Sequence, residues 1–213
     1  MKRKYDLVIF DLDGTLLNTS AGIFNSVRYA EKNMGLNPIA NERLKEFVGP
    51  PPKSMYMKVY GLDEEKAFEA AKFHREYGRT KAIYEAVLYD GVLELLKGLK
   101  NRGYKLAVST LKGQKIAEAV LENFEIAKYF DVIVGMDEKE SLTKCMTIKL
   151  AMDCVNVSQK AVMIGDSQYD HDGATEAGID FIGVTYGFGF DNNYMHPFKS
   201  TDTVYGILNF LEG

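Results

Sequence analysis

Short, strongly apolar runs alternate with stretches of helical periodicity along most of the chain. One such stretch, from Val92 to Leu99, has apolar residues at i, i+3, i+4 and i+7, and Gly103 follows it as a C-terminal stop. Strands that alternate with helices of this length form βαβ units, which build a parallel sheet covered on both faces. The sequence therefore predicts a doubly wound α/β fold. Its strands are expected at Tyr5–Phe10, Leu106–Val108, Val132–Val134, Ala161–Ile164 and Phe181–Val184.

The segment from about Asn18 to Tyr89 does not fit this alternation, because it contains no convincing strand. It is too long for a loop, its apolar residues recur at helical spacing, and glycines and prolines divide it into short pieces. The sequence therefore predicts a helical domain at residues 18–87. This domain would be inserted into an α/β core formed by residues 1–17 and 88–213.

Polar side chains directly follow three of the predicted strands. Asp11 and Asp13 come after the first strand, and Thr110 follows the second. Asp166 and Asp170 come after the fourth. Because ligands of an open parallel sheet bind beyond the carboxyl ends of its strands, these side chains are expected to converge on one small volume.

Four carboxylates in one small volume need a compensating charge. Two unit charges about 4 Å apart repel by roughly 4 kcal/mol at an effective dielectric constant of about 20, so the cluster must bind protons or a cation. Oxygen ligands without a nearby His or Cys favour Mg²⁺, which takes one or two carboxylates, several waters and a substrate phosphate. A calcium-binding loop is disfavoured, because its sixth position requires Gly and here holds Leu16 or His171.

The composition limits which binding partners and which cellular location are expected. The chain has 26 Lys and Arg against 30 Asp and Glu, a formal net charge of −4, so no general attraction to nucleic acid polymers or anionic membranes is expected. No apolar run approaches the roughly 18 residues that span a bilayer, and the run after the basic N-terminus is too short for a secretory signal. Cys145 and Cys154 are interpreted as buried free thiols, and a cytoplasmic location is expected.

Four ordered motifs resemble those of the haloacid dehalogenase superfamily. In order, they are Phe10–Leu16, Thr110, Lys144 and Gly165–Asp170. The helical segment between the first two motifs resembles the helical cap of that superfamily. Phe47–Pro51 together with Gly183–Gly187 resembles its phosphoglycolate phosphatase-like branch, which also includes nucleotidase-like and pyrophosphatase-like members.

The resemblance implies a phosphatase that works through an aspartyl-phosphate. Asp11 would be the nucleophile that attacks phosphorus. Asp13 would protonate the leaving oxygen and then activate the hydrolytic water. Mg²⁺ would be held by Asp11, the backbone carbonyl of Asp13 and Asp166, and would reduce the repulsion between the nucleophile and the phosphoryl group.

Three further residues would support this centre. Thr110 would donate its hydroxyl to a phosphoryl oxygen, Lys144 would place a positive charge beside that oxygen, and Asp170 would orient Lys144. Ser109 competes with Thr110, and alternation along a strand lets only one of them face the site. Lys144 is preferred to the neighbouring lysines because it would begin a helix and point toward the strand ends.

The predicted cap is expected to select the substrate by closing over the leaving group and gating access of water. Asn18, at the hinge, and Lys53, after three prolines, are the candidates for contact with the leaving group. The aromatic and methionine side chains from Met55 to Tyr60 are expected to form the core of the cap. The three histidines have no paired ligand spacing and are expected on the surface or in packing.

The function expected from these features is a Mg²⁺-dependent phosphatase for a small phosphorylated metabolite such as phosphoglycolate, a nucleotide or a sugar phosphate, acting as a monomer or homodimer. A phosphomutase of this superfamily is disfavoured, because that branch tends to carry an acidic residue where this chain has Gly165. A dehalogenase would lack Asp13. A pyrophosphatase of the same superfamily stays open, whereas a non-catalytic phosphate-binding module is disfavoured by the presence of both Asp11 and Asp13.

Overall fold

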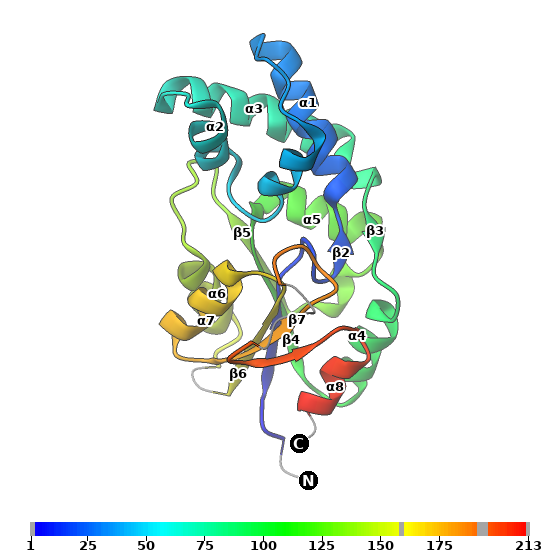
Figure 1. Ribbon diagram of the computed structural model, residues 1–213. Coiled ribbons are helices and arrows are strands. Elements are labelled where there is room, and N and C mark those ends of the chain that lie inside the picture. Colours follow the sequence, from blue (N-terminus) through cyan, green and yellow to red (C-terminus); the bar gives the residue numbers. More distant parts are fainter. Residues whose placement is uncertain (1–2, 158–159, 191–195, 212–213) are drawn as a thin grey trace.

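A parallel sheet forms the centre of the larger part of the molecule in the computed structural model, which describes residues 3–157, 160–190 and 196–211 (Figure 1). The sheet has six strands in the order β5-β4-β1-β6-β7-β8, and every neighbouring pair runs parallel. The predicted α/β fold is therefore confirmed. The strands are β1 (Leu7–Phe10), β4 (Lys105–Gly113), β5 (Val132–Met136), β6 (Ala161–Gly165), β7 (Asp180–Val184) and β8 (Lys199–Thr201).

Helices cover both faces of the sheet (Figure 1). Alternate residues of β1 point to opposite faces, so Val8 and Phe10 join one hydrophobic core and Leu7 and Ile9 join the other. The first core contains α4 (Val92–Asn101), α5 (Gln114–Asn123) and α8 (Gly206–Leu211), and the second contains α6 (Lys144–Cys154) and α7 (Gln168–Ala177). None of the described helices has both the length and the apolar composition needed to cross a membrane.

Within the six-stranded sheet, two strands depart most from the sequence prediction. β8 is not predicted, because it has three residues that are exposed or only partly buried, and no apolar run marks it. β4 continues to Gly113, well beyond the predicted end at Val108, and its register with β5 shifts after Ser109. The extension places the residues that follow the second motif at the carboxyl edge of the sheet.

Most of the chain between β1 and α4 leaves the sheet and forms a separate helical layer beyond the carboxyl ends of the strands (Figure 1). We call residues 19–86 the helical segment. The antiparallel strands β2 (Leu17–Asn18) and β3 (Val87–Leu88) lie at its two ends; with two residues each, they are too short to produce a periodic signal. The helices of this segment are α1 (Ser20–Met34), α2 (Pro52–Tyr60) and α3 (Glu64–Thr80), with 3-10 helices at η1 (Asn41–Phe47) and η2 (Ala82–Tyr84). Another 3-10 helix, η3 (Ala127–Tyr129), belongs to the sheet part.

Small side chains let α1 and α3 pack closely. Ala67, Ala70 and Ala71 are fully buried on one face of α3, in a third hydrophobic core that is separate from the two cores of the sheet. Asp63 caps the start of α3 by accepting a hydrogen bond from the Lys66 backbone amide at 2.9 Å. The helical segment therefore has its own apolar interior.

Two expectations about burial are wrong. Cys154 is exposed, because the buried face of α6 carries Ile148, Ala151 and Met152, and Cys154 lies off that face; Cys145 is buried as expected. Met57 is also exposed, although its neighbours Met55 and Tyr56 are buried in the core of the helical segment as expected.

The histidines pack against aromatic rings, as expected. His171 and His196 both lie beside Phe198. His74 lies in the helical segment between Phe47 and Tyr56, and its Nδ1 is 3.3 Å from the Tyr56 hydroxyl. Burial lowers the pKa of His74 to about 3, so the folded protein keeps this imidazole neutral.

Acid should destabilise the fold through His74. Below about pH 6.5 the unfolded chain binds a proton on this imidazole, whereas the folded protein does so only near pH 3. The free energy of unfolding should therefore fall as the pH drops from 6.5 to 4.5, with His74 contributing up to about 1.4 kcal/mol per pH unit. Urea unfolding of the wild type and His74→Gln across this range would show a shallower decline in the variant. Parallel curves would contradict the assignment.

Candidate active site

Two neighbouring strands bring the predicted carboxylates together. β1 and β6 pair with Phe10 beside Ile164, so Asp11 and Gly165-Asp166 follow at the same edge of the sheet. Oxygen atoms of Asp11, Asp166 and Asp170 all lie within 4.8 Å of one another, and the three side chains are buried. The expected convergence of acidic residues from distant parts of the chain is therefore present for these three.

Lys144 pairs with two of the three carboxylates of this cluster, Asp11 and Asp170. It is the first residue of α6, as expected, and Thr143 caps that helix by accepting from the Met146 backbone amide. Lys144 Nζ lies 2.5 Å from Asp11 Oδ1 and 2.7 Å from Asp170 Oδ1. It also donates to the backbone carbonyl of Ser109 at 2.6 Å. All three contacts are buried, so the ammonium is surrounded by oxygen acceptors.

Both oxygens of Asp170 are engaged by the protein. Oδ1 pairs with Lys144, and Oδ2 accepts from the Ser167 backbone amide at 3.0 Å and from the Ser167 hydroxyl at 2.6 Å. Gly165 makes this position available, because a Cβ there would collide with the Asp170 side chain. This arrangement orients Lys144 and leaves Asp170 little capacity for another ligand.

Asp166 is held by the loop after β7. Its Oδ2 accepts from the Phe188 backbone amide at 2.7 Å, and Oδ1 lies 3.4 Å from the Thr15 hydroxyl. Gly14 has a φ of +83°, and a Cβ at this position would overlap the Asp166 carboxylate. Asp13-Gly14 therefore forms a turn, and the absence of a side chain at Gly14 lets the backbone lie close to the Asp166 carboxylate.

The buried carboxylates are only partly neutralised. Burial, followed by repulsion from Asp170 and Asp13, raises the pKa of Asp11 to about 7 even though Lys144 opposes the shift. Burial and the charges of Asp170 and Asp11 raise the pKa of Asp166 well above its ordinary value. The cluster therefore demands additional positive charge, and its oxygen-only donor set and close spacing fit a hard divalent cation such as Mg²⁺.

Asp13 faces a different partner. Its carboxylate pairs with Lys112 Nζ at 2.9 and 3.1 Å and is not part of the three-residue cluster. Sequence reasoning missed Lys112, because the predicted second strand ends at Val108 and a lone lysine beyond it resembles a solvated surface charge. The position of Lys112, two residues after Thr110 of the second motif, was the one sequence feature that could have indicated a place in the site.

The two hydroxyl candidates differ in their contacts. The Ser109 side chain exchanges a hydrogen bond of 2.9 Å with Thr147 on α6, which turns it toward that helix. Thr110 is buried, and its oxygen accepts from the Lys112 backbone amide at 3.1 Å. Thr110 is not among the described residues that line the cavity beside Asp11.

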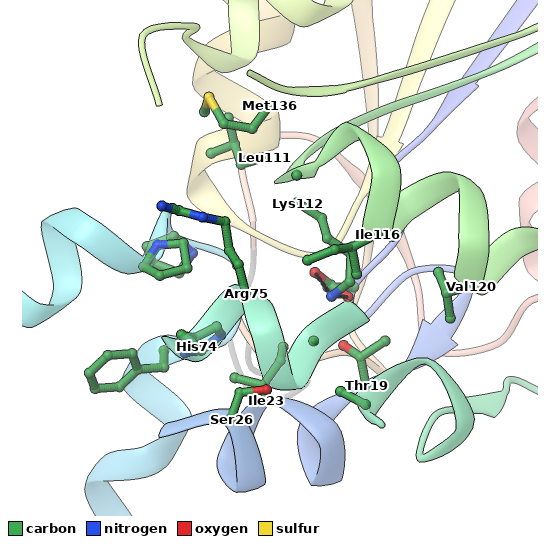
Figure 2. Close-up of a pocket in the computed structure, with 18 of the residues that line it drawn as sticks. Thr19, Ile23, Ser26, His74, Arg75, Leu111, Lys112, Ile116, Val120 and Met136 are labelled. Carbon is green, nitrogen blue, oxygen red and sulfur yellow. Dashed lines mark hydrogen bonds and ion pairs between the residues drawn. The ribbon is translucent and has the colours of Figure 1, made fainter. Parts of the chain in front are cut away.

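Two adjoining cavities meet at Asp13. We call the first the acidic pocket; Asp11, Asp13, Lys144, Asp166 and Asp170 line it from the sheet, and Lys45, Val48 and Gly49 line it from the helical segment. We call the second the apolar pocket; it lies between the helical segment and α5 (Figure 2). Asp13, Gly49 and Leu111 line both. Sequence reasoning missed Lys45, whose exposed side chain carries no distinguishing pattern.

The two predicted leaving-group contacts lie beside the pockets. Asn18 Oδ1 accepts from the Ser20 backbone amide and hydroxyl, and Lys53 Nζ lies 3.1 Å from Glu64 on α3. Neither is among the described residues that line the two pockets, whereas the adjacent residues Thr19 and Pro52 are.

Comparisons with known proteins identify the family of this chain. The model of the haloacid dehalogenase-like hydrolases matches residues 8–184. A 5'-nucleotidase of Pseudomonas aeruginosa is 36% identical over 191 residues, which cover 89% of this chain and 86% of that protein. The tyrosine-protein kinase PtkA of Mycobacterium tuberculosis is 35% identical over 185 residues, covering 86% of this chain and 63% of the kinase.

A solved structure shows the same fold along nearly the whole chain. The crystal structure of a predicted phosphatase from Clostridium acetobutylicum superposes with a TM-score of 0.89 at 38% sequence identity, covering 97% of both chains. The region matched by the family model contains all four predicted motifs. The chain therefore belongs to the haloacid dehalogenase-like hydrolase family and is a hydrolase of the phosphatase type.

Proposed function

We propose that this protein is a Mg²⁺-dependent phosphatase that hydrolyses a small phosphate monoester through an aspartyl-phosphate on Asp11. The observation that carries the proposal is the cluster of Asp11, Asp166 and Asp170, two of which pair with Lys144; all of these residues line a cavity that Asp13 also lines. This arrangement provides a nucleophile, an acid and a site for an anionic phosphoryl group within one small volume.

Asp11 would act as the nucleophile. Lys144 binds its Oδ1, and no donor to its Oδ2 is found among the described residues, so Oδ2 would attack phosphorus. A bond forms between Asp11 and phosphorus while the bond from phosphorus to the leaving oxygen breaks. Lys144 would also attract a phosphoryl oxygen and thereby lower the charge repulsion in the transition state.

Asp13 would move the proton. It lies where the acidic and apolar pockets meet, so it would stand between a phosphoryl group in the first pocket and a leaving group in the second. Asp13 would first protonate the leaving oxygen, and Lys112 at 2.9 Å would stabilise the resulting carboxylate. Asp13 would then accept a proton from the water that attacks the aspartyl-phosphate, releasing inorganic phosphate and regenerating Asp11.

Mg²⁺ would be held by Asp11, Asp166 and the backbone carbonyl of Asp13. When bound, the ion would neutralise charge between the nucleophile and the phosphoryl group. Asp166 is positioned for this role by the Phe188 backbone amide and the Thr15 hydroxyl. Asp170 would act through Lys144, since both of its oxygens are already engaged.

We further propose that residues 18–87 act as a cap domain on the core formed by residues 1–17 and 88–213. Support comes from the separate hydrophobic core of the helical segment and from its position over the carboxyl ends of the strands (Figure 1). Lys45 lines the acidic pocket from this side and would attract a phosphoryl oxygen. Glu140 joins the two parts, since it accepts from the Lys53 backbone amide and pairs with Arg75.

The substrate is proposed to be a small phosphorylated metabolite. The relative from Pseudomonas aeruginosa is named a 5'-nucleotidase, which favours a nucleotide among the esters considered. A pyrophosphatase remains the alternative from the same family. Substrate contacts by Thr110, Asn18 and Lys53, a cytoplasmic location and a monomeric or homodimeric state stay predictions.

Asp11→Asn should lower kcat by at least about 1,000-fold, because an amide cannot form the phosphorylated intermediate. Release of inorganic phosphate from p-nitrophenyl phosphate in the presence of Mg²⁺ measures this loss. The matched control is Asp172→Asn, an exposed carboxylate on α7, which should retain activity within about twofold. If Asp11→Asn kept more than a tenth of the wild-type rate, Asp11 would not be the nucleophile.

Mg²⁺ should stabilise the folded protein through Asp166. An ion that binds only the native state at 100 times its Kd contributes about 2.7 kcal/mol, which corresponds to a rise in Tm of roughly 5 to 10 °C. Asp166→Asn removes one ligand and should abolish most of that rise, whereas Asp172→Asn should preserve it. Thermal unfolding with EDTA and with MgCl₂ provides the comparison. An equal rise in all three proteins would place the ion elsewhere.

A further inference from the structure

Thr19 carries a hydroxyl without a partner. It precedes α1 at the N-cap position, where a threonine side chain usually accepts a backbone hydrogen bond, yet no such cap is formed here. Thr19 is 4% exposed. Its Oγ1 is the one buried side-chain nitrogen or oxygen atom that lacks a hydrogen-bond partner among the described residues. A buried hydroxyl in this state destabilises the free protein, which points to a ligand as the missing partner.

This hydroxyl belongs to the wall of the apolar pocket. Figure 2 shows Thr19 near Ile23 and Lys112, with its oxygen turned toward the space that the labelled side chains surround. The pocket is partly open to solvent, and its lining residues come from both the helical segment and the sheet part. Its walls are largely apolar, with contributions from Ile23, Phe47, Leu111, Ile116, Val120 and Met136.

The charged side chains of this pocket already have partners. Lys112 pairs with Asp13 at 2.9 Å, and Arg75 pairs with Glu140 at 2.5 Å. Asp137, the remaining carboxylate of the wall, accepts from the Ser141 amide and hydroxyl. His74 also lines the pocket, and burial lowers its pKa to about 3, which keeps the ring neutral. In the free protein, each cation among the described lining residues is therefore already paired with a carboxylate.

We propose that the apolar pocket binds the leaving group of the phosphate ester, and that this group is uncharged, has an apolar ring-bearing body and forms a hydrogen bond with Thr19. The inference rests on the proposed function, since Asp13 must protonate the leaving oxygen where the two pockets meet. Thr19 would be a specificity-determining residue. Nucleosides and substituted aryl alcohols share this chemistry.

The same features disfavour other leaving groups. The carboxylate of phosphoglycolate and the second phosphate of pyrophosphate would enter a largely apolar wall whose cations already face Asp13 and Glu140, at a high desolvation cost. Glucose would bring four further hydroxyls and no aromatic ring to a surface that offers few unpaired polar atoms, whereas a nucleoside brings two hydroxyls together with an aromatic base. The apolar pocket would therefore select among phosphate esters that the catalytic residues alone would treat alike.

A substrate panel tests the pocket. Phosphate release in Mg²⁺ would be measured for adenosine 5'-monophosphate, p-nitrophenyl phosphate, phenyl phosphate, 2-phosphoglycolate, glucose 6-phosphate and pyrophosphate. The ring-bearing esters should exceed the other three in kcat/KM by at least about tenfold. A preference for phosphoglycolate, glucose 6-phosphate or pyrophosphate would overturn the inference while leaving the phosphatase function standing. If none of the six released phosphate, the proposed function and the inference would both fail.

Thr19→Val tests the hydroxyl, because valine has nearly the same shape and cannot form the hydrogen bond. Phenyl phosphate, whose ring carries no polar substituent, is the internal reference. The ratio of kcat/KM for the hydrogen-bonding ester to that for phenyl phosphate should fall about tenfold, which corresponds to about 1.4 kcal/mol. Thr19→Ser keeps the hydroxyl and should restore the ratio.

Two further readouts complete the design. The Tm of the free Thr19→Val protein should be unchanged or higher, since the hydroxyl it loses has no partner in the protein. If the ratio falls for adenosine 5'-monophosphate, the leaving group bound in the pocket is a nucleoside. If it falls for p-nitrophenyl phosphate alone, the leaving group is an aryl alcohol. Either result supports the proposal that the apolar pocket binds the leaving group. An unchanged ratio for both esters, or a similar fall in Thr19→Val and Thr19→Ser, would overturn the role of Thr19.

Discussion

Repulsion between buried carboxylates is the constraint on which the site depends. Asp11, Asp166 and Asp170 bring negative charge into a volume that excludes most water, and one lysine cannot neutralise all of it. Hydrogen-bond donors of the protein contact all three carboxylates. Lys144 pairs with Asp11 and Asp170, and backbone amides donate to Asp170 and Asp166. The remaining imbalance raises the pKa of Asp11 to about 7 and makes the cluster receptive to a cation.

The surrounding backbone is shaped to permit this crowding. Gly14 and Gly165 are positions where a side chain would occupy the space of Asp166 or Asp170. Gly173 on α7 leaves room for Lys144, since a Cβ there would lie 2.7 Å from the lysine Cγ. The glycines near the motifs therefore have a steric role in addition to forming turns. They allow charged side chains from separate strands and helices to share one small volume.

The two pockets differ in the charge of their lining residues. Charged residues line the acidic pocket, where a phosphoryl group and a cation would be bound, whereas the apolar pocket has its ionic side chains already paired. Asp13 lines both pockets, and in the proposed mechanism it would transfer a proton where they meet. Under the proposed function, the acidic pocket would accept phosphate monoesters in general, and the apolar pocket would discriminate among them.

Local patterns in the sequence determined the buried strands and the helices between them, because a strand buried in a parallel sheet requires a continuous apolar run. They also identified the acidic residues of the site, because ligands of such a sheet bind at the carboxyl ends of its strands. Tertiary structure decided what those patterns do not encode: the length of β4, which brings Lys112 to Asp13, and the exposure of Cys154. It also decided that Thr19 and Pro52 line the apolar pocket while their neighbours Asn18 and Lys53 do not. A shift of one residue turns a side chain to another side of the backbone, and only the packing of the helical segment against the sheet part determines which side faces the cavity.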